Sequence, residues 1–394
     1  MAADSAGRII VSGIMFHTPV AGVIYQVLHY MIGLRRLGHD VFYVEDTNWW
    51  SLDPRTGDVS PDPTRSLEVA VPVLERYGFG ERWAYRRAHA VDEPKGCWGL
   101  PEDDVLLLYR EADALLNVTG SQWLWEEMRD CPNRILIESD PLSTQIDAAN
   151  GVPGVLDHLA AHHRHFTFGE TLHNDAFPVP LGPYAWLPTR QPVVLELWQA
   201  DHLPTDRVLS TVTSWHDDHK DRTWQGETYY WTKDRAFRVV LDLPRRRPGR
   251  FRLAVTDEVK ADRDELIASG WLLDRALRIS ADLDLYHAFI TGSWGEFSVA
   301  RDQYARARTG WFSDRSACYL AAGRPVITQE TGFSAVLPTG EGLFAWSTTE
   351  EVLDALDAID AAPRRHQLAA AEIAREHFAA ERVIERLLSQ AGLT

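Results

Sequence analysis

Short apolar runs alternate with amphipathic stretches along this chain, and this alternation constrains the fold more than any other feature. The segment RIIVSGIMF (8–16) is predicted to be a buried strand, and residues 23–37 have the apolar spacing of a helix that Gly38 ends. The segment DVFYVED (40–46) is a second strand. A strand, a helix and a strand in this order form a right-handed unit with two parallel strands. The chain is therefore predicted to belong to the α/β class.

The other strands predicted in the first half end in small or acidic residues. The apolar segments 113–120, 134–140 and 164–170 end in glycine, aspartate and glutamate, respectively. Ligands of open α/β sheets bind beyond the carboxyl ends of the strands. We therefore expect Asp140 and Glu170 to face one crevice.

A cluster of prolines divides the chain. The segment FPVPLGPYAWLPTRQP (177–192) cannot continue a sheet, and a length of 394 residues suits two domains. We predict an N-terminal domain at 1–190, a C-terminal domain at 191–370 and a closing helix at 371–394 that packs back toward the first domain.

The second half repeats the alternation of strands and helices. Its predicted strands are VLSTVTSW (208–215), RFRLAV (250–255), DLYHAFIT (284–291) and RPVIT (324–328). Its predicted helices are 262–269, 313–322 and 349–359, followed by one long amphipathic helix at 366–388.

The composition is that of a soluble globular protein, with 45% apolar and 25% charged residues. No stretch approaches the roughly 18 consecutive apolar residues of a membrane span, and the first residues lack the pattern of a secretion signal. We therefore expect a cytoplasmic protein. Cys97, Cys131 and Cys318 lack the spacing of a disulfide framework or a thiolate zinc site, so we expect reduced cysteines.

The formal net charge of -17 opposes long-range attraction of nucleic-acid phosphates. It predicts that nucleic acid is not a partner, and that any anionic ligand is held by local groups in a cleft. We expect a monomer or a homodimer.

A local anion site is predicted at the start of the helix in GWFSDRSACYLAAGRPVITQETG (310–332). The Ser313 hydroxyl is placed to accept a hydrogen bond from the amide of Ser316, with Asp314 and Arg315 in the same first turn. Free backbone amides and a guanidinium then converge on one point, which suits a phosphate or diphosphate. The alternative is an ordinary capped helix whose Arg315 lies in solvent.

The order of elements and several segments resemble the GT-B glycosyltransferases. Residues 316–359 look like the donor-domain segment of that family, 374–388 are similar to the closing helix of family 4 enzymes, and 315–325 are similar to spore-maturation-type members. Residues 22–46 match the first helix and second strand more loosely. The resemblance implies two Rossmann-like domains facing each other across a cleft. It also implies sugar transfer from a nucleotide-diphosphate donor of UDP or dTDP type to a small-molecule acceptor, in specialised metabolism, without a further cofactor or a divalent metal.

The sequence departs from that family at two places. Gly310 and Cys318 stand where retaining members carry a pair of glutamates, so retention or inversion stays open. Where the family grips the diphosphate with an arginine and a lysine, this chain has Trp215 and Lys220. The resemblance implies that Lys220 keeps the role and that Arg315 supplies the missing charge.

The resemblance also implies further donor ligands. Trp271 occupies a place beside the nucleotide base, where it stacks on the base or belongs to the core. Glu330, Thr331 and Gly332 form a turn that approaches the sugar and diphosphate, and Glu296 binds the sugar or pairs with an arginine.

The proposed chemistry needs a base for the acceptor, and His17 is the candidate because it follows the first strand on the loop that carries Gly22. Asp140 and Glu170 are expected to orient His17 or to bind the acceptor. Gly22 and Trp49 are expected to line the acceptor site.

Metal ligation is not predicted in the acidic and histidine-rich segment of the chain. His216, Asp217, Asp218 and His219 are adjacent in sequence, and adjacent residues cannot all face one ion. Two alternatives to sugar transfer stay open: epimerisation of a nucleotide sugar on the same fold, and binding of a sugar or nucleotide without catalysis.

Overall fold

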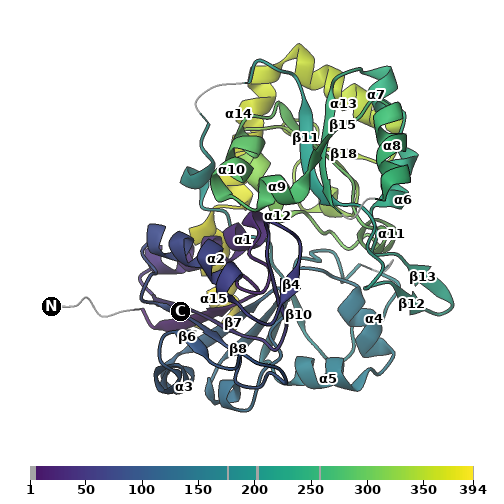
Figure 1. The fold of residues 1–394 in the computed structure, drawn as a ribbon. Coiled ribbons are helices and arrows are strands. Elements are labelled where there is room, and N and C mark those ends of the chain that lie inside the picture. The colour runs from purple at the N-terminus through teal and green to yellow at the C-terminus, as the bar shows by residue number, and fades with distance from the viewer. Residues whose placement is uncertain (1–5, 175–176, 201–203, 257–258, 394) are drawn as a thin grey trace.

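The computed structural model describes residues 6–174, 177–200, 204–256 and 259–393. Within these residues, residues 8–188 build a sheet of eight strands and residues 209–346 build a sheet of six. Figure 1 shows the two sheets in separate halves of the molecule, the N-terminal half below and the C-terminal half above.

The sheet of the N-terminal half has the order β10-β9-β8-β7-β1-β2-β5-β6 and is parallel apart from the β5–β6 pair. Its strands are β1 (Arg8–Ser12), β2 (Asp40–Asp46), β5 (Trp83–Arg86), β6 (Cys97–Gly99), β7 (Ala114–Val118), β8 (Arg134–Glu138), β9 (Arg164–Thr167) and β10 (Trp186–Pro188). A short pair, β3 (Ser51–Leu52) and β4 (Val59–Ser60), lies apart from it. The helices are α1 (Ala21–Arg36), α2 (Thr64–Arg76), α3 (Glu102–Glu111), α4 (Ser143–Ala149) and α5 (Pro153–Ala160).

The sheet of the C-terminal half is parallel throughout, with the order β15-β14-β11-β16-β17-β18. Its strands are β11 (Leu209–Ser214), β14 (Phe251–Thr256), β15 (Leu272–Arg275), β16 (Gly295–Ser298), β17 (Val326–Gln329) and β18 (Leu343–Trp346). A separate hairpin is formed by β12 (Arg222–Trp224) and β13 (Glu227–Tyr229). The helices are α6 (Asp234–Val239), α7 (Leu243–Arg246), α8 (Lys260–Ala268), α9 (Ala276–Ser280), α10 (Leu283–Thr291), α11 (Asp302–Ala307), α12 (Asp314–Ala321), α13 (Thr349–Ala361), α14 (Pro363–His377) and α15 (Ala380–Ala391).

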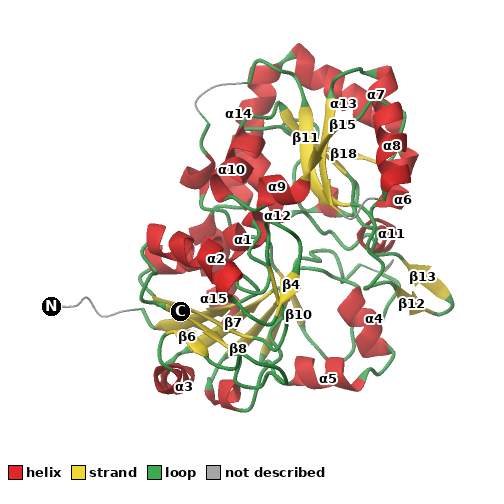
Figure 2. Cartoon of the chain, viewed as in Figure 1, coloured by secondary structure: helices red, strands yellow, loops and turns green. Residues whose placement is uncertain are grey.

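Helices cover the faces of both sheets (Figure 2), which explains why several strands are buried along their whole length. All five residues of β7 are buried, for example, and they read ALLNV without a polar alternation. In both sheets the loops that follow parallel strands lie at one edge, so the residues that come after β1, β2, β7, β8 and β11 are brought toward the junction of the halves.

The two halves share one hydrophobic core. Helix α15 returns to the N-terminal half and packs on α1, where a methyl group at Gly33 would overlap Ile384 and press on Ala380. Backbone hydrogen bonds from Val193 to Phe378 and from Ala380 to Val193 fasten the connecting segment to the same place. Apolar side chains of α1, α10, α12, α14 and α15 belong to one buried cluster.

Three predictions about elements are wrong. The proline-rich segment 177–192 was expected not to continue the sheet, but its residues Trp186–Pro188 form β10, which pairs with β9 at the edge of the sheet, where a proline is tolerated. Residues 284–291 form most of helix α10 rather than a strand, because the Asp282 carboxylate caps the helix at the Leu285 amide and Leu283, Tyr286 and Ile290 have helical spacing. The predicted single helix at 366–388 is broken between α14 and α15.

The described residues contain no helix long and apolar enough to cross a membrane. Cys97, Cys131 and Cys318 are free thiols. The domain limits at residues 190 and 370, the cytoplasmic location and the oligomeric state stay predictions.

Candidate functional site

A cavity of about 430 Å³ lies between the two halves, and we call it the central cavity. Helix α1 lines one side with Gly22 and Gln26. The C-terminal half lines the other side with Thr213 and Ser214, at the carboxyl end of β11, and with the start of α12. The cavity therefore occupies the position at which parallel α/β sheets bind ligands. Gly22, which was expected to line an acceptor site, lies here instead.

Helix α12 begins at the central cavity, but its first turn differs from the prediction. Ser313 makes no side-chain capping bond, so the predicted bond from the amide of Ser316 is not formed, and the Ser316 side chain is fully buried outside the cavity lining. Ser313, Asp314 and Arg315 do line the cavity. Asp314 Oδ1 accepts a hydrogen bond from Gln26 across the cavity (3.2 Å), and burial raises the pKa of Asp314 to about 7.

Arg315 points into the protein, and three partners hold its guanidinium. Its Nε pairs with Glu296 Oε1 (2.5 Å), Nη1 donates to Val212 O (2.7 Å), and Nη2 donates to Ser298 Oγ (2.8 Å). Most of its capacity to donate is therefore used inside the protein, so we regard it as a fixed positive charge at the cavity wall. Glu296 is fully buried in β16 and pairs with Arg315, so of its two expected partners, a sugar and an arginine, the structure shows the arginine.

Lys233 is a buried lysine that the sequence analysis missed. It is 6% exposed and immediately precedes α6, where its amide donates to the carbonyl of Trp215 at the end of β11 (3.2 Å). Within the described residues, no hydrogen bond or ion pair engages its ammonium group. Burial lowers the pKa of Lys233 well below the ordinary 10.5, and the charges of Arg315 and Arg301 lower it further. A buried cation without a partner is costly, so this position indicates an anion site.

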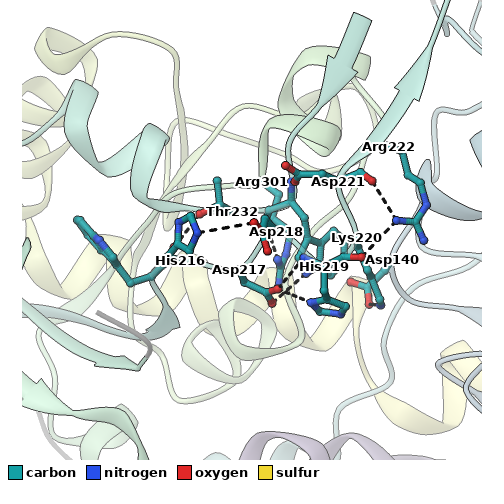
Figure 3. A network of polar contacts seen from close by, with 12 residues as sticks. Asp140, His216, Asp217, Asp218, His219, Lys220, Asp221, Arg222, Thr232 and Arg301 are labelled. Carbon is teal, nitrogen blue, oxygen red and sulfur yellow. Dashed lines mark hydrogen bonds and ion pairs between the residues drawn. The ribbon is translucent and has the colours of Figure 1, made fainter. Parts of the chain in front are cut away.

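Two further cations surround the indole ring of Trp231. The guanidinium carbon of Arg301 lies 3.5 Å from the ring centroid, and the ammonium nitrogen of Lys220 lies 4.5 Å from it. Arg301 lines the central cavity and donates to Trp231 O (2.6 Å). Lys220 instead approaches Asp140 Oδ2 (3.6 Å), as Figure 3 shows. The structure therefore contradicts the assignment of Lys220 to the donor site, because Lys220 lines a different cavity.

That different cavity, which we call the side cavity, has a volume of about 250 Å³ and lies beyond β7 and β8. Asp140 and Glu138 from the end of β8, Lys220 from the C-terminal half, and the indoles of Trp49 and Trp123 line it. The two indoles are 42% and 45% exposed, so their faces are free for a ligand. Trp49, which was predicted to contact the acceptor, lines this cavity, and its role in acceptor binding stays a prediction.

Two carboxyl groups in the side cavity differ in their acidity. Burial raises the pKa of Glu138 to about 7, and its oxygens accept hydrogen bonds from Gln145 Nε2 (2.9 and 3.1 Å) and Thr167 Oγ1 (2.7 Å). Burial also pushes the pKa of Asp140 upward, but the charges of Lys220 and Arg301 and the hydrogen bond from Tyr304 together outweigh burial and lower it. Glu138 is therefore the carboxyl group poised to exchange a proton near neutral pH, and the sequence analysis missed it because it focused on Asp140.

His17 does not line either cavity. Its Nδ1 lies 2.7 Å from Thr18 Oγ1, its amide donates to Glu45 Oε1 (2.7 Å), and its ring meets Trp49 edge to face at 5.0 Å between centroids. Burial lowers the pKa of His17 to about 4, which makes its imidazole a weak base. The structure therefore does not support His17 as the base, and neither Asp140 nor Glu170 orients it. Glu170 instead pairs with Arg190 at 2.5 Å and is nearly buried.

Four further predicted donor ligands lie away from the central cavity. Trp271 is 3% exposed and packs on Phe251 in the core of the C-terminal half, so it cannot stack on a base. Gly332 has a φ of +98° and its amide bonds to the Glu330 carboxylate, while Thr331 bonds to a backbone carbonyl. This turn satisfies its own polar groups and is not part of the lining of either cavity.

Metal ligands do not converge in the described residues: no group of three or more His, Cys, Asp or Glu side chains is arranged to hold an ion. His219 pairs with Asp217 (Figure 3), and His216 Nδ1 lies 3.7 Å from Asp234 Oδ2. Independence from a metal stays a prediction.

Two Rossmann-like halves that face each other across a cavity, closed by a helix that returns to the first half, define the GT-B fold, and the chain has this fold. An α-glucosyltransferase solved with UDP and a 13-mer DNA containing an HMU base is similar with a TM-score of 0.59 and 8% identity, over 98% of this chain and 99% of that chain. Anabaena Alr3699/HepE, solved with UDP and glucose, is similar with a TM-score of 0.55 and 11% identity, over 98% and 100% of the chains. AviGT4, a glycosyltransferase involved in avilamycin A biosynthesis, is similar with a TM-score of 0.52 and 12% identity, over 98% and 97%. No protein-family model and no curated protein matches the chain.

The DNA complexes among these similar structures correct one prediction that was based on the net charge. The exclusion of nucleic acid as a partner is wrong, because structures that share the fold over nearly the whole chain include α-glucosyltransferase complexes with DNA. Net charge describes the long-range field of the whole molecule and not the groups inside a cleft.

Proposed function

We propose that the protein is a glycosyltransferase that moves a sugar from a nucleoside diphosphate to an acceptor bound in the side cavity. The observation that carries this proposal is the buried, unpaired Lys233, whose charge interacts with those of Arg315 and Arg301, two residues that line the central cavity. The likeness in fold to transferases solved with UDP supports the same assignment.

A balance of charge supports a diphosphate as the anion. The carboxylates whose charges act on Lys233 are Glu296 and Asp140, and both are already paired, with Arg315 and Lys220, respectively. Burial raises the pKa of Asp314 to about 7, which reduces its negative charge near neutral pH. Cations in a cleft of low dielectric stabilise the charge that develops on a leaving diphosphate. We propose that Lys233 and Arg301 contact the phosphates directly, and that Arg315 acts through its field.

The apolar end of the central cavity is suited to the nucleoside. Ala276 and Leu277 at the start of α9 and Thr256 at the end of β14 line it, and these elements lie next to β11 in the sheet. We propose a donor of UDP or dTDP type on this basis, and sequence similarity in residues 316–359 favours a family 4-like enzyme.

The side cavity supplies the group that accepts the proton. In the proposed step a hydroxyl oxygen of the acceptor bonds to the anomeric carbon, the bond from that carbon to the diphosphate oxygen breaks, and the hydroxyl proton passes to the carboxylate of Glu138. A pKa of about 7 lets Glu138 accept this proton without being protonated beforehand at pH 8. We propose a small-molecule acceptor, because the side cavity has a volume of only about 250 Å³.

The first test is titration of the protein with UDP and with dTDP by isothermal calorimetry. We expect micromolar to millimolar binding of one of them in wild type and a loss of at least tenfold in Lys233→Met. Incubation with labelled nucleotide sugars, with and without acceptors, then separates transfer from epimerisation by mass spectrometry. Failure of wild type to bind either nucleotide rejects the proposal.

A further inference from the structure

A third cavity adjoins the side cavity, and we call it the indole cavity. Its volume is about 100 Å³. Its walls are Trp49, Trp123 and Trp125, and its floor is the end of β2 with Asp46, Thr47 and Asn48. The side cavity and the indole cavity share Trp49, Ser121 and Trp123, so the two spaces lie side by side.

Three oxygen atoms on the floor of the indole cavity are buried and have no hydrogen-bond partner among the described residues. They are Asp46 Oδ1, Thr47 Oγ1 and Asn48 Oδ1. Asp46 is 1% exposed and Thr47 is 5% exposed, so a folded protein without a ligand leaves these groups poorly solvated. Two of the three oxygens can only accept, so a matching ligand must donate hydrogen bonds.

The floor is held in place by contacts from β7 and the loop after it. The amide of Asp46 donates to Gln122 Oε1 (2.8 Å), and Trp125 Nε1 donates to the carbonyl of Asp46 (3.3 Å). Gln122 is itself bonded through Nε2 to Gly13 O (2.8 Å). The unpaired oxygens therefore belong to a rigid, pre-formed surface.

The cations around these cavities are already engaged by carboxylates, in the pairs Asp46–Arg86 (2.6 Å), Asp147–Arg222 (2.7 Å) and Asp140–Lys220 (3.6 Å). Arg86 also pairs with Glu102 (3.0 Å) and Glu127 (2.6 Å). A phosphate group therefore finds no free cation among these residues. The unpaired oxygens of the floor need hydrogen-bond donors, which the hydroxyl groups of a neutral ligand supply.

We propose that the indole cavity binds a pyranose ring of the acceptor, so that the enzyme extends a molecule that already carries a sugar. One face of such a ring stacks on an indole, and its neighbouring hydroxyls reach the three oxygens of the floor. A planar aromatic acceptor also stacks on indoles, but it offers few donors and leaves the oxygens unpaired. The statement that the enzyme extends a glycoside rests on the proposed function. The statement that the indole cavity binds a sugar rests on the cavity alone.

The positions of the indole cavity and the side cavity determine how long the acceptor must be. Trp49 and Trp123 border the indole cavity, whereas Glu138 and Asp140 lie in the side cavity, where the charge of Arg301 from the central cavity acts on Asp140. A sugar in the indole cavity therefore does not receive the transferred group itself. The reactive hydroxyl belongs to the next unit of the acceptor, in the side cavity.

The test measures binding of a panel of p-nitrophenyl glycopyranosides, with p-nitrophenol as the matched aglycone, by saturation-transfer NMR and calorimetry. UDP binding is measured on the same samples as a check of fold and of the donor site. We expect at least one glycoside to bind ten or more times tighter than p-nitrophenol, with its sugar protons in closest contact. Thr47→Val is expected to weaken this glycoside about tenfold, because it removes one hydroxyl at constant shape, and Trp123→Ala at least as much.

Trp50→Ala is the control, because Trp50 is 47% exposed and belongs to neither cavity. We expect it to change glycoside binding less than twofold. Equal binding of p-nitrophenol and every glycoside, no binding by any panel member, or preferential binding of an oligonucleotide containing 5-hydroxymethyluracil overturns the proposal. If the protein binds a glycoside but not UDP, the sugar-binding proposal stands and the transferase proposal is rejected. If it binds UDP but no glycoside, the sugar-binding proposal is rejected and the transferase proposal stands.

Discussion

Lys233 belongs to a candidate site that is recognisable only in the folded structure. The spacing from Trp215 pointed to Lys220, but the segment 216–231 forms a loop and a hairpin that lie between the end of β11 and α6. Lys233, and not Lys220, therefore stands at the start of the helix after β11. The sequence analysis predicted no helix at 234–239, and nothing in the spacing from Trp215 revealed the hairpin that precedes α6.

Lys233→Met is expected to weaken UDP binding about ten- to a hundredfold, because a hydrogen bond to a charged group contributes about 1.5–3 kcal/mol. It should also raise the melting temperature of the unliganded protein, since it removes a buried unpaired charge. Lys220→Met should leave UDP affinity within about twofold. Calorimetry and thermal unfolding check both variants, and equal losses of UDP affinity would contradict the assignment.

UDP binding is also expected to take up a proton. The folded pKa of Lys233 lies well below 10.5, and a nearby diphosphate raises it again. Between these two pKa values the free protein holds a neutral amine and the complex an ammonium ion, so affinity falls as the pH rises through that window. Calorimetry in buffers of different ionisation enthalpy measures the uptake, which Lys233→Met should abolish.

Glu138 links the pH dependence of stability to that of activity. Burial raises its pKa from 4.5 to about 7, so between these values the folded protein holds a proton that the unfolded chain has released. Its contribution to stability therefore declines as the pH rises from about 4.5 to about 7, by on the order of 3 kcal/mol. Glu138→Gln should melt at a higher temperature than wild type at pH 8 but not at pH 4.5.

The same Glu138→Gln variant should lose about a hundredfold or more in kcat, as expected for loss of a general base. In wild type, activity should rise with pH through about 7 as the carboxyl ionises, and the variant should lose this limb of its profile. An unchanged pH profile in the variant would show that another group accepts the proton.

At the scale of elements, the β12–β13 hairpin of the C-terminal half binds α4 of the N-terminal half beside the side cavity. Arg222 pairs with Asp147, Asn150 Nδ2 donates to Thr223 O (3.2 Å), and Trp224 Nε1 donates to Pro178 O (3.0 Å). Figure 1 shows the hairpin at the edge of the molecule, next to α4. The hairpin therefore fixes the position of Lys220, which lies just before it.

Trp224→Ala is expected to raise the KM for the acceptor several-fold with a smaller change in kcat, because the hairpin loses both a hydrogen bond and buried apolar surface. Hydrogen exchange at residues 220–231 should become faster. Gln225→Gly is the control, because Gln225 at the turn has a φ of +51° that glycine adopts readily. If the two variants behave alike, the docking of the hairpin has no role in acceptor binding.

The elements that the sequence predicted best were long and had a clear period. Helix α1 and strand β2 agree with their predicted ranges within a few residues, whereas 284–291 was assigned as a strand because a short apolar run fits both periods. The carboxylate of Asp282, which caps α10, was the missed signal.

At the scale of the molecule, the fold class followed from the alternation of strands and helices, which is a property of the whole chain. The cavities did not follow from it. Each is built from loops of both halves or of several strands, and the side chains that line them, such as Glu138 and Trp123, are far apart in sequence. Burial, which changes the pKa of Glu138 and Lys233, is also a property of the assembled molecule and is not visible in the sequence.

The core shared by the halves predicts how the molecule unfolds. Helix α15 packs on α1 through Gly33, Ala380 and Ile384, so neither half keeps its buried surface if the other opens. Calorimetry should therefore show one unfolding transition, which UDP at about a hundred times its Kd stabilises by about 2.7 kcal/mol. Gly33→Leu should lower the temperature of that same single transition, because its side chain cannot fit against Ile384.

Two separate unfolding transitions would contradict this prediction. If the protein shows two transitions, with UDP shifting only one and Gly33→Leu shifting only the other, then the halves are independent and the cavity between them is not held by a common core. A single transition that both UDP and Gly33→Leu displace, in opposite directions, links the donor site to the packing of α15 on α1. The distant core would then hold the central cavity in the shape that binds the nucleotide.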